Sequence, residues 1–241
     1  MSRDAKYYAA VEATWPPVTT HAIGCITVRE GRGGGSRVSS ATADDLPDLA
    51  TLRQTEAEMR AVRQTPQFMI RKGETLLDQL LEVQGYRIKD PVTLYTVAAA
   101  KLADIVIPRV TTFCIWPPLA IQKEIWTAGG ISDRRFAVME RVVGAKTAIL
   151  GRIDDQPAGT AFVAQHGDIA MLHGLEIAPE HRRKGLAGWM MRHAGQWAKR
   201  NGAHELAVAV TQANQAANHL YQSLGMDVVG HYHYRILEEN A

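Results

Sequence analysis

Cysteine, long apolar runs and net charge are all scarce in this chain of 241 residues. Its two cysteines, Cys25 and Cys114, are too few for a disulfide scaffold or a cysteine metal site. Two reduced thiols are typical of a cytoplasmic protein. No apolar run approaches the roughly 18 residues that a membrane helix needs, and the first residues lack the uninterrupted apolar core of a signal peptide. We therefore expect a cytoplasmic protein with no membrane partner.

The near balance of charges argues against nucleic acid as a partner. Lysine and arginine number 27 and aspartate and glutamate 25, which gives a formal net charge of +2. A protein that binds nucleic acid usually shows a marked basic excess. Hydrophobic residues make up 46%, as in an ordinary globular protein, and the length suits one large domain or two small ones. Any site for an anion must therefore be local.

The second half of the sequence has clear helix and strand patterns. Strands are expected at residues 147–153, 158–165, 169–177, 204–210 and 226–236. Helices are expected at residues 118–126, 134–143, 186–200 and 214–225. Pro179 ends the third strand, because proline cannot donate to a sheet ladder, and Gly225 stops the last helix.

The first half is less regular and predicts a smaller mixed α/β unit. Residues 23–30 and 36–43 are expected to form a hairpin around the glycine-rich turn at residues 31–35. A helix capped near Asp44 or Asp45 should follow. The order then continues as strand, helix and strand over residues 66–71, 74–86 and 91–98. We accordingly predict two units, residues 1–105 and 106–241.

The stretch "GLEIAPEHRRKGLAG" places three consecutive cations, Arg182, Arg183 and Lys184, directly before a glycine and a helix. Unpaired N–H groups and the helix dipole make such a junction attractive to an anion. Gly185 would let a bulky phosphate approach the backbone. A basic turn before a helix is also common on a solvated surface, so this pattern alone leaves both interpretations open.

Two motifs resemble the GNAT acetyltransferase superfamily. Arg182-x-x-Gly185-x-Ala187 matches its Gln/Arg-x-x-Gly-x-Gly/Ala signature, and "NQAANHLYQSLGM" is similar to its second signature. The resemblance covers residues 147–236 well and the two preceding helices loosely. It implies a mixed, mostly antiparallel central sheet flanked by helices. The N-terminal half more faintly resembles the leading half of two-part members, but it lacks a signature loop of its own, so one acyl-CoA site is expected.

The resemblance also implies residues that bind acetyl-CoA, as a co-substrate and without a metal. The diphosphate would lie on the loop before the predicted helix, and the pantetheine arm would lie along the third strand as an added strand. The cofactor-binding residues implied in this way are Leu175, Ile177, Arg182, Arg183, Lys184, Gly185, Leu186, Ala187, Gly188 and Asn214. Ala187 stands where glycine is the commoner residue.

Direct attack of an amine on the thioester needs a base and an acid. A primary amine has a pKa of about 10.4, so it must lose a proton before it attacks. Tyr221 matches the family tyrosine that protonates the departing thiolate, although a buried aromatic residue would satisfy the same pattern. The base could be His173 or Glu176, or else water or a residue of the N-terminal unit. Alternation along the strand predicts that His173 and Glu176 face opposite sides of the sheet.

These features predict an N-acetyltransferase that acts on a primary amine of a small molecule, amino acid or peptide. The alternative is a non-catalytic, regulatory acyl-CoA-binding module. The N-terminal unit is expected to cover the acceptor side. His231 and His233 could share one strand face as metal ligands do, but no third ligand has a matching spacing, so no metal site is expected. A homodimer is compatible with the sequence.

Overall fold

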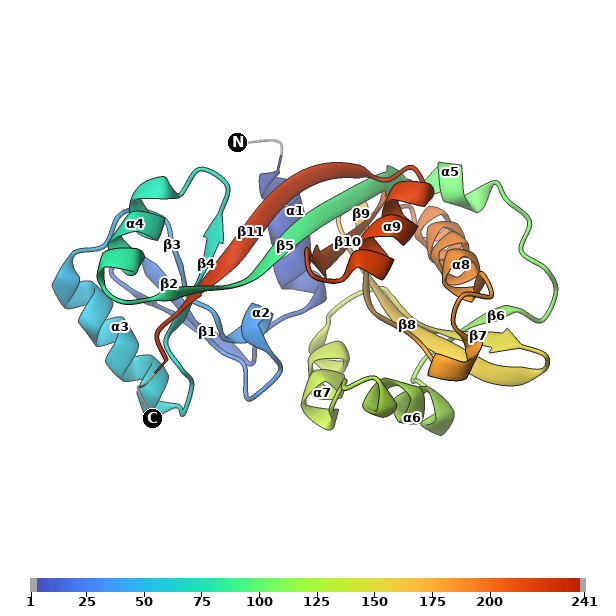
Figure 1. The fold of residues 1–241 in the computed structure, drawn as a ribbon, viewed down its shortest axis with the longest axis horizontal. Coiled ribbons are helices and arrows are strands. Elements are labelled where there is room, and N and C mark those ends of the chain that lie inside the picture. Colours follow the sequence, from blue (N-terminus) through green and yellow to red (C-terminus); the bar gives the residue numbers. More distant parts are fainter. Residues whose placement is uncertain (1–3, 239–241) are drawn as a thin grey trace.

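A large, mostly antiparallel sheet organises the chain (Figure 1). The computed structural model describes residues 4–238. The large sheet contains, from edge to edge, β4 (Gln67–Arg71), β11 (Asp227–Ile236), β5 (Arg87–Ala98), β10 (Glu205–Thr211), β9 (Ile169–Ile177), β8 (Gln156–His166), β7 (Lys146–Ile153) and β6 (Thr112–Ile115). A small second sheet contains β1 (Thr19–Ile23), β2 (Ile26–Glu30) and β3 (Thr42–Ala43). This mixed α/β architecture confirms the expected fold class.

Helices cover both faces of the large sheet and flank the small one. They are α1 (Ala5–Thr14), α2 (Ser36–Ser39), α3 (Leu49–Ala61), α4 (Thr75–Val83), α5 (Ala99–Ala103), α6 (Ala120–Ala128), α7 (Asp133–Arg141), α8 (Leu186–Arg200) and α9 (Gln215–Ser223). On one face α8 packs against β7 and β9, and on the other α1 and α6 pack against β8 and β9. No helix in the described part of the chain is long and apolar enough to cross a membrane.

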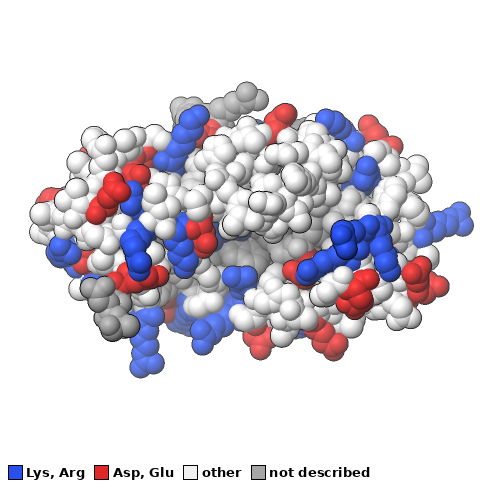
Figure 2. Space-filling view, in the orientation of Figure 1, with Lys and Arg blue, Asp and Glu red and all other residues white. Residues whose placement is uncertain are grey.

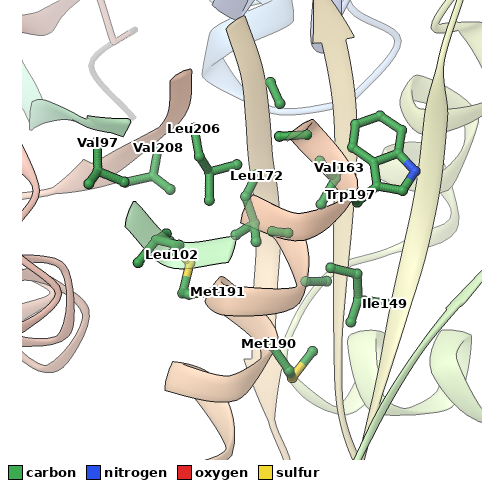
Figure 3. Packing of buried hydrophobic residues seen from close by; sticks show 14 of the residues in the cluster. Val97, Leu102, Ile149, Val163, Leu172, Met190, Met191, Trp197, Leu206 and Val208 are labelled. Atoms are coloured by element: carbon green, nitrogen blue, oxygen red, sulfur yellow. The ribbon is translucent and has the colours of Figure 1, made fainter. Parts of the chain in front are cut away.

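The core under α8 holds this helix against the sheet (Figure 3). Met190 and Met191 are completely buried, and they meet strand residues such as Ile149 and Leu172. Truncating a methionine in such a site to alanine costs about 2–5 kcal/mol. Because the same helix begins at the cationic loop, this packing fixes the position of the loop relative to β9.

The two units predicted from the sequence share one sheet. β5 precedes residue 105, yet it is hydrogen-bonded between β11 and β10 from the end of the chain. β4 likewise pairs with β11. In Figure 1, β5 and β11 run side by side through the middle of the molecule. The division into residues 1–105 and 106–241 stays a prediction, and any such units are joined through hydrogen-bonded strands.

The N-terminal hairpin predicted from the sequence is confirmed only in part: β2 pairs antiparallel with β3 through Ile26 with Ala43 and Thr27 with Thr42, but the limits of both segments are wrong. The tight turn lies at Gly24 and Cys25, inside the segment expected to be one strand, so β1 pairs with β2. A two-residue turn with a left-handed glycine closes a hairpin without further loop residues. Residues 36–39, expected in a strand, form the short helix α2.

The next helix begins later than expected, and several elements have no counterpart among those predicted from the sequence. Asp48, rather than Asp44 or Asp45, caps α3 by accepting a hydrogen bond from the Thr51 amide at 2.7 Å. Pro47 keeps the residue before it out of the helical conformation. Elements without a predicted counterpart include α1, which buries Tyr7, Val11 and Thr14 on one face, the short helix α5, and β6, which has only four residues and lies at a sheet edge.

Candidate active site

The strands β9 and β10 separate at the centre of the large sheet. They pair in parallel from Ile169 with Glu205 to Leu172 with Val208. Beyond these pairs β9 continues to Ile177 and β10 to Thr211 without further pairing between them. The other edge of β9 stays paired with β8 as far as Ile177. The result is a wedge in which one edge of β9 offers its backbone to a ligand.

A bulge at Gly174 changes which side chains share a face. His173 pairs with Phe162 and Glu176 with Thr160, so two residues of β9, Gly174 and Leu175, oppose the single residue Ala161. Gly174 occupies the bulge with a φ of +55°, and such an extra residue shifts the alternation of a strand. Residues that pair directly across two strands have side chains on the same face. Phe162 and Thr160 also share a face, because they are two residues apart on β8. His173 and Glu176 therefore face the same side, and the predicted opposition is wrong.

The cationic loop presents free backbone donors at the start of α8. Gly185 is the N-cap, in the left-handed region at a φ of +82°, and Arg183 is also left-handed at +61°. The N–H groups of residues 183–187 have no hydrogen-bond acceptor in the described part of the chain. A Cβ built on Gly185 would meet no atom within 4 Å. The loop thus has the open space and the donors that bind an anion at a helix N-terminus.

The side chains around this loop add positive charge. Arg182, Arg183 and Lys184 are exposed, and Figure 2 shows Lys and Arg side chains gathered near the start of α8. Arg182 also braces the loop against β9, because its Nε donates to the Ile177 carbonyl at 3.0 Å and its Nη2 to the Glu176 carboxylate at 2.9 Å.

The remaining residues expected to bind the cofactor lie on β9, α8 and α9. Leu175 and Ile177 are half-buried against the core under α8, and Leu186 is buried. Ala187 and Gly188 are partly exposed in the first turn of α8. The Asn214 side chain caps α9 by accepting from the Ala217 amide at 3.1 Å. The structure thus gives Asn214 a capping contact, and its cofactor role stays a prediction.

Tyr221 lies on α9 in the core that also contains Leu175 and Val210. It is 5% exposed, and its ring centroid is 5.8 Å from that of Tyr95 on β5. Its hydroxyl forms no hydrogen bond with any described residue. Burial raises the pKa of Tyr221 well above its usual range. The phenol therefore keeps its proton at neutral pH, as a proton donor must.

His173 is a buried, neutral histidine with both ring nitrogens engaged. Its Nδ1 lies 3.0 Å from Nη1 of Arg37, and its Nε2 lies 2.9 Å from the Thr14 hydroxyl. A guanidinium can only donate, so Nδ1 accepts and Nε2 carries the proton. Burial, and then the charge of Arg37, lower the pKa of His173 well below 6.5. As a base, His173 would have to release Nδ1 from Arg37.

A cavity of about 220 Å³ lies between the two parts of the chain, beside His173. Trp15 and Arg37 line it from the N-terminal segment, Arg135 from α7, and Gly174 from β9. Figure 2 shows this face hollowed near its middle, between α2 and α7. Trp15, Arg37 and Arg135 are not among the site residues predicted from the sequence. Only the fold brings these three residues together at the cavity.

The discounted histidines of β11 have protein partners. His233 Nε2 lies 2.9 Å from the Asp78 carboxylate, and His231 Nδ1 lies 3.3 Å from the Thr93 hydroxyl. Among residues 4–238, no group of three or more His, Cys, Asp or Glu side chains is placed to hold a metal ion.

A sheet split by a wedge, beside a loop of free main-chain donors, is an arrangement suited to an extended ligand with an anionic group. The family model described as "Acetyltransferase (GNAT) family" matches residues 120–226. The aminoglycoside N(6')-acetyltransferase type 1 of Serratia marcescens is 30% identical over 118 residues, which cover 44% of this chain and 81% of that protein. The chain belongs to the GNAT acetyltransferase family.

Two further comparisons extend this result. Streptothricin acetyltransferase of Streptomyces lavendulae is 30% identical over 116 residues, which cover 47% of this chain and 60% of that protein, less than two thirds of its length. A solved GCN5-related N-acetyltransferase from Kribbella flavida superposes with a TM-score of 0.73 at 18% identity. It covers 100% of this chain and 97% of its own, so the likeness of fold includes the N-terminal segment.

Proposed function

We propose that the protein transfers an acetyl group from acetyl-CoA to a primary amine of a small molecule, amino acid or peptide. The observation that carries this proposal is the loop before α8, where the amides of residues 183–187 are free beside the wedge of β9. The diphosphate would bind these amides, and the pantetheine arm would extend along the unpaired edge of β9. Relatives named for acetylating streptothricin and aminoglycosides support a small-molecule acceptor.

The reaction would proceed by direct attack. The amine nitrogen bonds to the thioester carbonyl carbon, the carbon–sulfur bond breaks, and a base takes the proton that the amine loses. Tyr221 would protonate the departing thiolate, because its hydroxyl is protonated and free of hydrogen bonds to described residues. A backbone N–H near Ile177 would polarise the carbonyl.

Two side chains remain candidates for the base, and both lie on the same face of β9. His173 has the histidine chemistry suited to the task, but its free lone pair is held by Arg37. Glu176 has a side chain 21% exposed and is paired with Arg182. Water relayed by either group is compatible with this geometry.

The N-terminal segment would form part of the acceptor site. Trp15, Arg37 and Asp90 line the cavity from this segment, opposite Arg135 and His173. Deleting the segment would not test this role cleanly, because β5 lies inside the large sheet. Substitutions on the cavity wall in the full chain are the sharper test.

Calorimetry with coenzyme A and thiol release from acetyl-CoA across an amine library test the proposal together. We expect binding of coenzyme A, turnover with at least one amine, and loss of that turnover in Tyr221→Phe. No binding to the folded protein would refute the acetyl-CoA site. Binding without turnover by any amine would favour a non-catalytic acyl-CoA-binding module instead.

A further inference from the structure

The cavity beside His173 is lined by more positive than negative charge. Arg37 reaches it from α2 and Arg135 from α7, whereas Asp90 is the one acidic residue among the described residues that line it. His173 is neutral there, because its pKa lies well below the usual value. The two guanidinium groups come from segments far apart in the sequence and line the same cavity.

Neither arginine is neutralised by the protein. In residues 4–238, no aspartate or glutamate forms an ion pair with Arg37 or Arg135, whereas Arg29 is paired with Glu12 and Arg182 with Glu176. The Arg37 guanidinium instead donates to the neutral His173. An arginine that a protein holds without a carboxylate at a cavity wall is suited to pair with an anion from outside.

Two buried polar atoms on the same wall have no partner at hydrogen-bond geometry, although the hydroxyls of Tyr232 and Tyr234 interact with the Arg37 side chain. They are Nε of Arg37 and the hydroxyl oxygen of Tyr232, and both residues line the cavity. Leaving such a group unpaired costs about 1–3 kcal/mol. A ligand with several acceptor oxygens would satisfy donors of this kind, and a carboxylate offers two oxygens in the plane that a guanidinium matches.

The size of the cavity limits the ligand. Its volume is about 220 Å³, below the roughly 300–1,000 Å³ of sites that take drug-sized ligands. Trp15 and Tyr234 supply aromatic surface beside the charged groups. The space therefore suits a small molecule with one anionic end.

We infer that the acceptor is a small amino acid whose carboxylate is bound by Arg37 and Arg135, with its amine directed to the wedge beside Gly174. This inference rests on the proposed acetyl transfer. It narrows the acceptor from any primary amine to one with a carboxylate in the same molecule. Removing the negative charge of the acceptor should therefore lower its kcat/KM more than changing the rest of its structure.

Matched pairs of acceptors test this directly. Thiol release from acetyl-CoA is measured with the twenty L-amino acids, β-alanine and γ-aminobutyrate, each beside its carboxamide. At least one acid should show a kcat/KM about tenfold or more above that of its amide, the effect of losing one charge-assisted contact. Equal use of acids and amides, preference for the amides, or turnover of no acid would overturn the inference.

Substitutions on α7 supply a matched control. Arg135→Gln should raise the KM for the preferred acid about tenfold and change the KM for its amide much less. Arg134→Gln removes the same charge from the neighbouring residue, which is exposed, lies against Gly33 and does not line the cavity. The Arg134→Gln variant should keep the preference for the acid over its amide. An identical loss in both variants would point to a general charge effect and contradict a specific contact.

Product binding separates this inference from the proposed function. The protein saturated with coenzyme A is titrated with the N-acetyl derivative of each acid and of each amide, and no turnover is needed. Stronger binding of the N-acetyl acids, lost in Arg37→Gln, supports the carboxylate site. Binding of coenzyme A without this preference refutes the carboxylate site and leaves acetyl transfer standing. Failure to bind coenzyme A refutes the proposed function itself.

Discussion

Replacing Gly185 with alanine separates backbone strain from ligand binding. Gly185 has a φ of +82°, and a left-handed conformation costs a residue with a Cβ about 1–2 kcal/mol. The added Cβ would meet no protein atom within 4 Å, so no clash adds to this cost. Alanine also lowers the entropy of the unfolded chain, which stabilises the fold by about 0.4–1 kcal/mol. The net loss should be about 1 kcal/mol, or a fall of about 2–4 °C in Tm.

The effect on coenzyme A should be larger. The new methyl group would stand where we place the diphosphate, and it would separate the phosphate from at least one loop amide. One charge-assisted hydrogen bond contributes about 1.5–3 kcal/mol, so the Kd for coenzyme A should rise about tenfold to a hundredfold. Calorimetry gives the Kd, and thermal unfolding without ligand gives the stability.

Gly202 provides the control because it shares the backbone geometry and lies at the other end of α8. Its φ is +83°, and a Cβ there would also meet nothing within 4 Å. Gly202→Ala should therefore lower Tm by a similar amount and leave the Kd unchanged. If both variants bind coenzyme A like the wild type, the diphosphate does not lie on this loop. If both lose affinity equally, instability rather than a local contact explains the result.

Three further predictions follow from buried groups and from the shared sheet. Tyr221→Phe should lower kcat about 10²- to 10⁴-fold with little change in the Kd for coenzyme A, and an unchanged kcat would assign proton delivery to another group. Burial, and then the charge of Arg200, lower the pKa of His193 to about 4. An unfolded histidine binds its proton at a pKa of about 6.5, so the free energy of unfolding should fall as pH drops from about 6.5 toward 4. Between pH 7 and pH 5, denaturant unfolding should show a smaller loss of unfolding free energy in His193→Gln than in the wild type. An equal loss in both proteins would contradict this assignment. Residues 106–241 alone lack β5 and β4, so they should show no cooperative thermal transition; a sharp transition would contradict the shared sheet.

The C-terminal elements could be predicted because their signals are local. The expected strand at residues 169–177 and the expected helix at residues 186–200 coincide with β9 and α8. The spacing of apolar residues indicates the type of each element, and the stops at Pro179 and Gly225 indicate where elements end. Both signals lie within or next to the element itself. The loop before α8 could be placed for the same reason, since its cations and glycine are consecutive.

The sharing of strands could not be predicted, because it depends on contacts between distant residues. Nothing in the sequence of β5 says that its neighbours will be β10 and β11, which follow more than 100 residues later. The same holds for the cavity, where Arg37 meets His173 only after both segments have folded. The bulge is different, because a glycine inside a strand often marks one. Gly174 therefore indicated a bulge, which the prediction of simple side-chain alternation along the strand did not take into account.

The contact between Arg37 and His173 links the choice of base to the choice of acceptor. The guanidinium holds the lone pair of His173 at 3.0 Å, and its charge adds to the effect of burial in lowering the pKa of His173. A carboxylate bound to Arg37 would offset this charge and compete for its N–H groups, so Nδ1 would become free when a carboxylate acceptor arrives. Glu176 has no such link, because its partner Arg182 belongs to the loop before α8. If His173 is the base, the carboxylate of the acceptor therefore acts on kcat as well as KM; if Glu176 is the base, it acts mainly on KM. The kinetics of one amino acid and its amide, measured in His173→Gln and Glu176→Gln, distinguish the two.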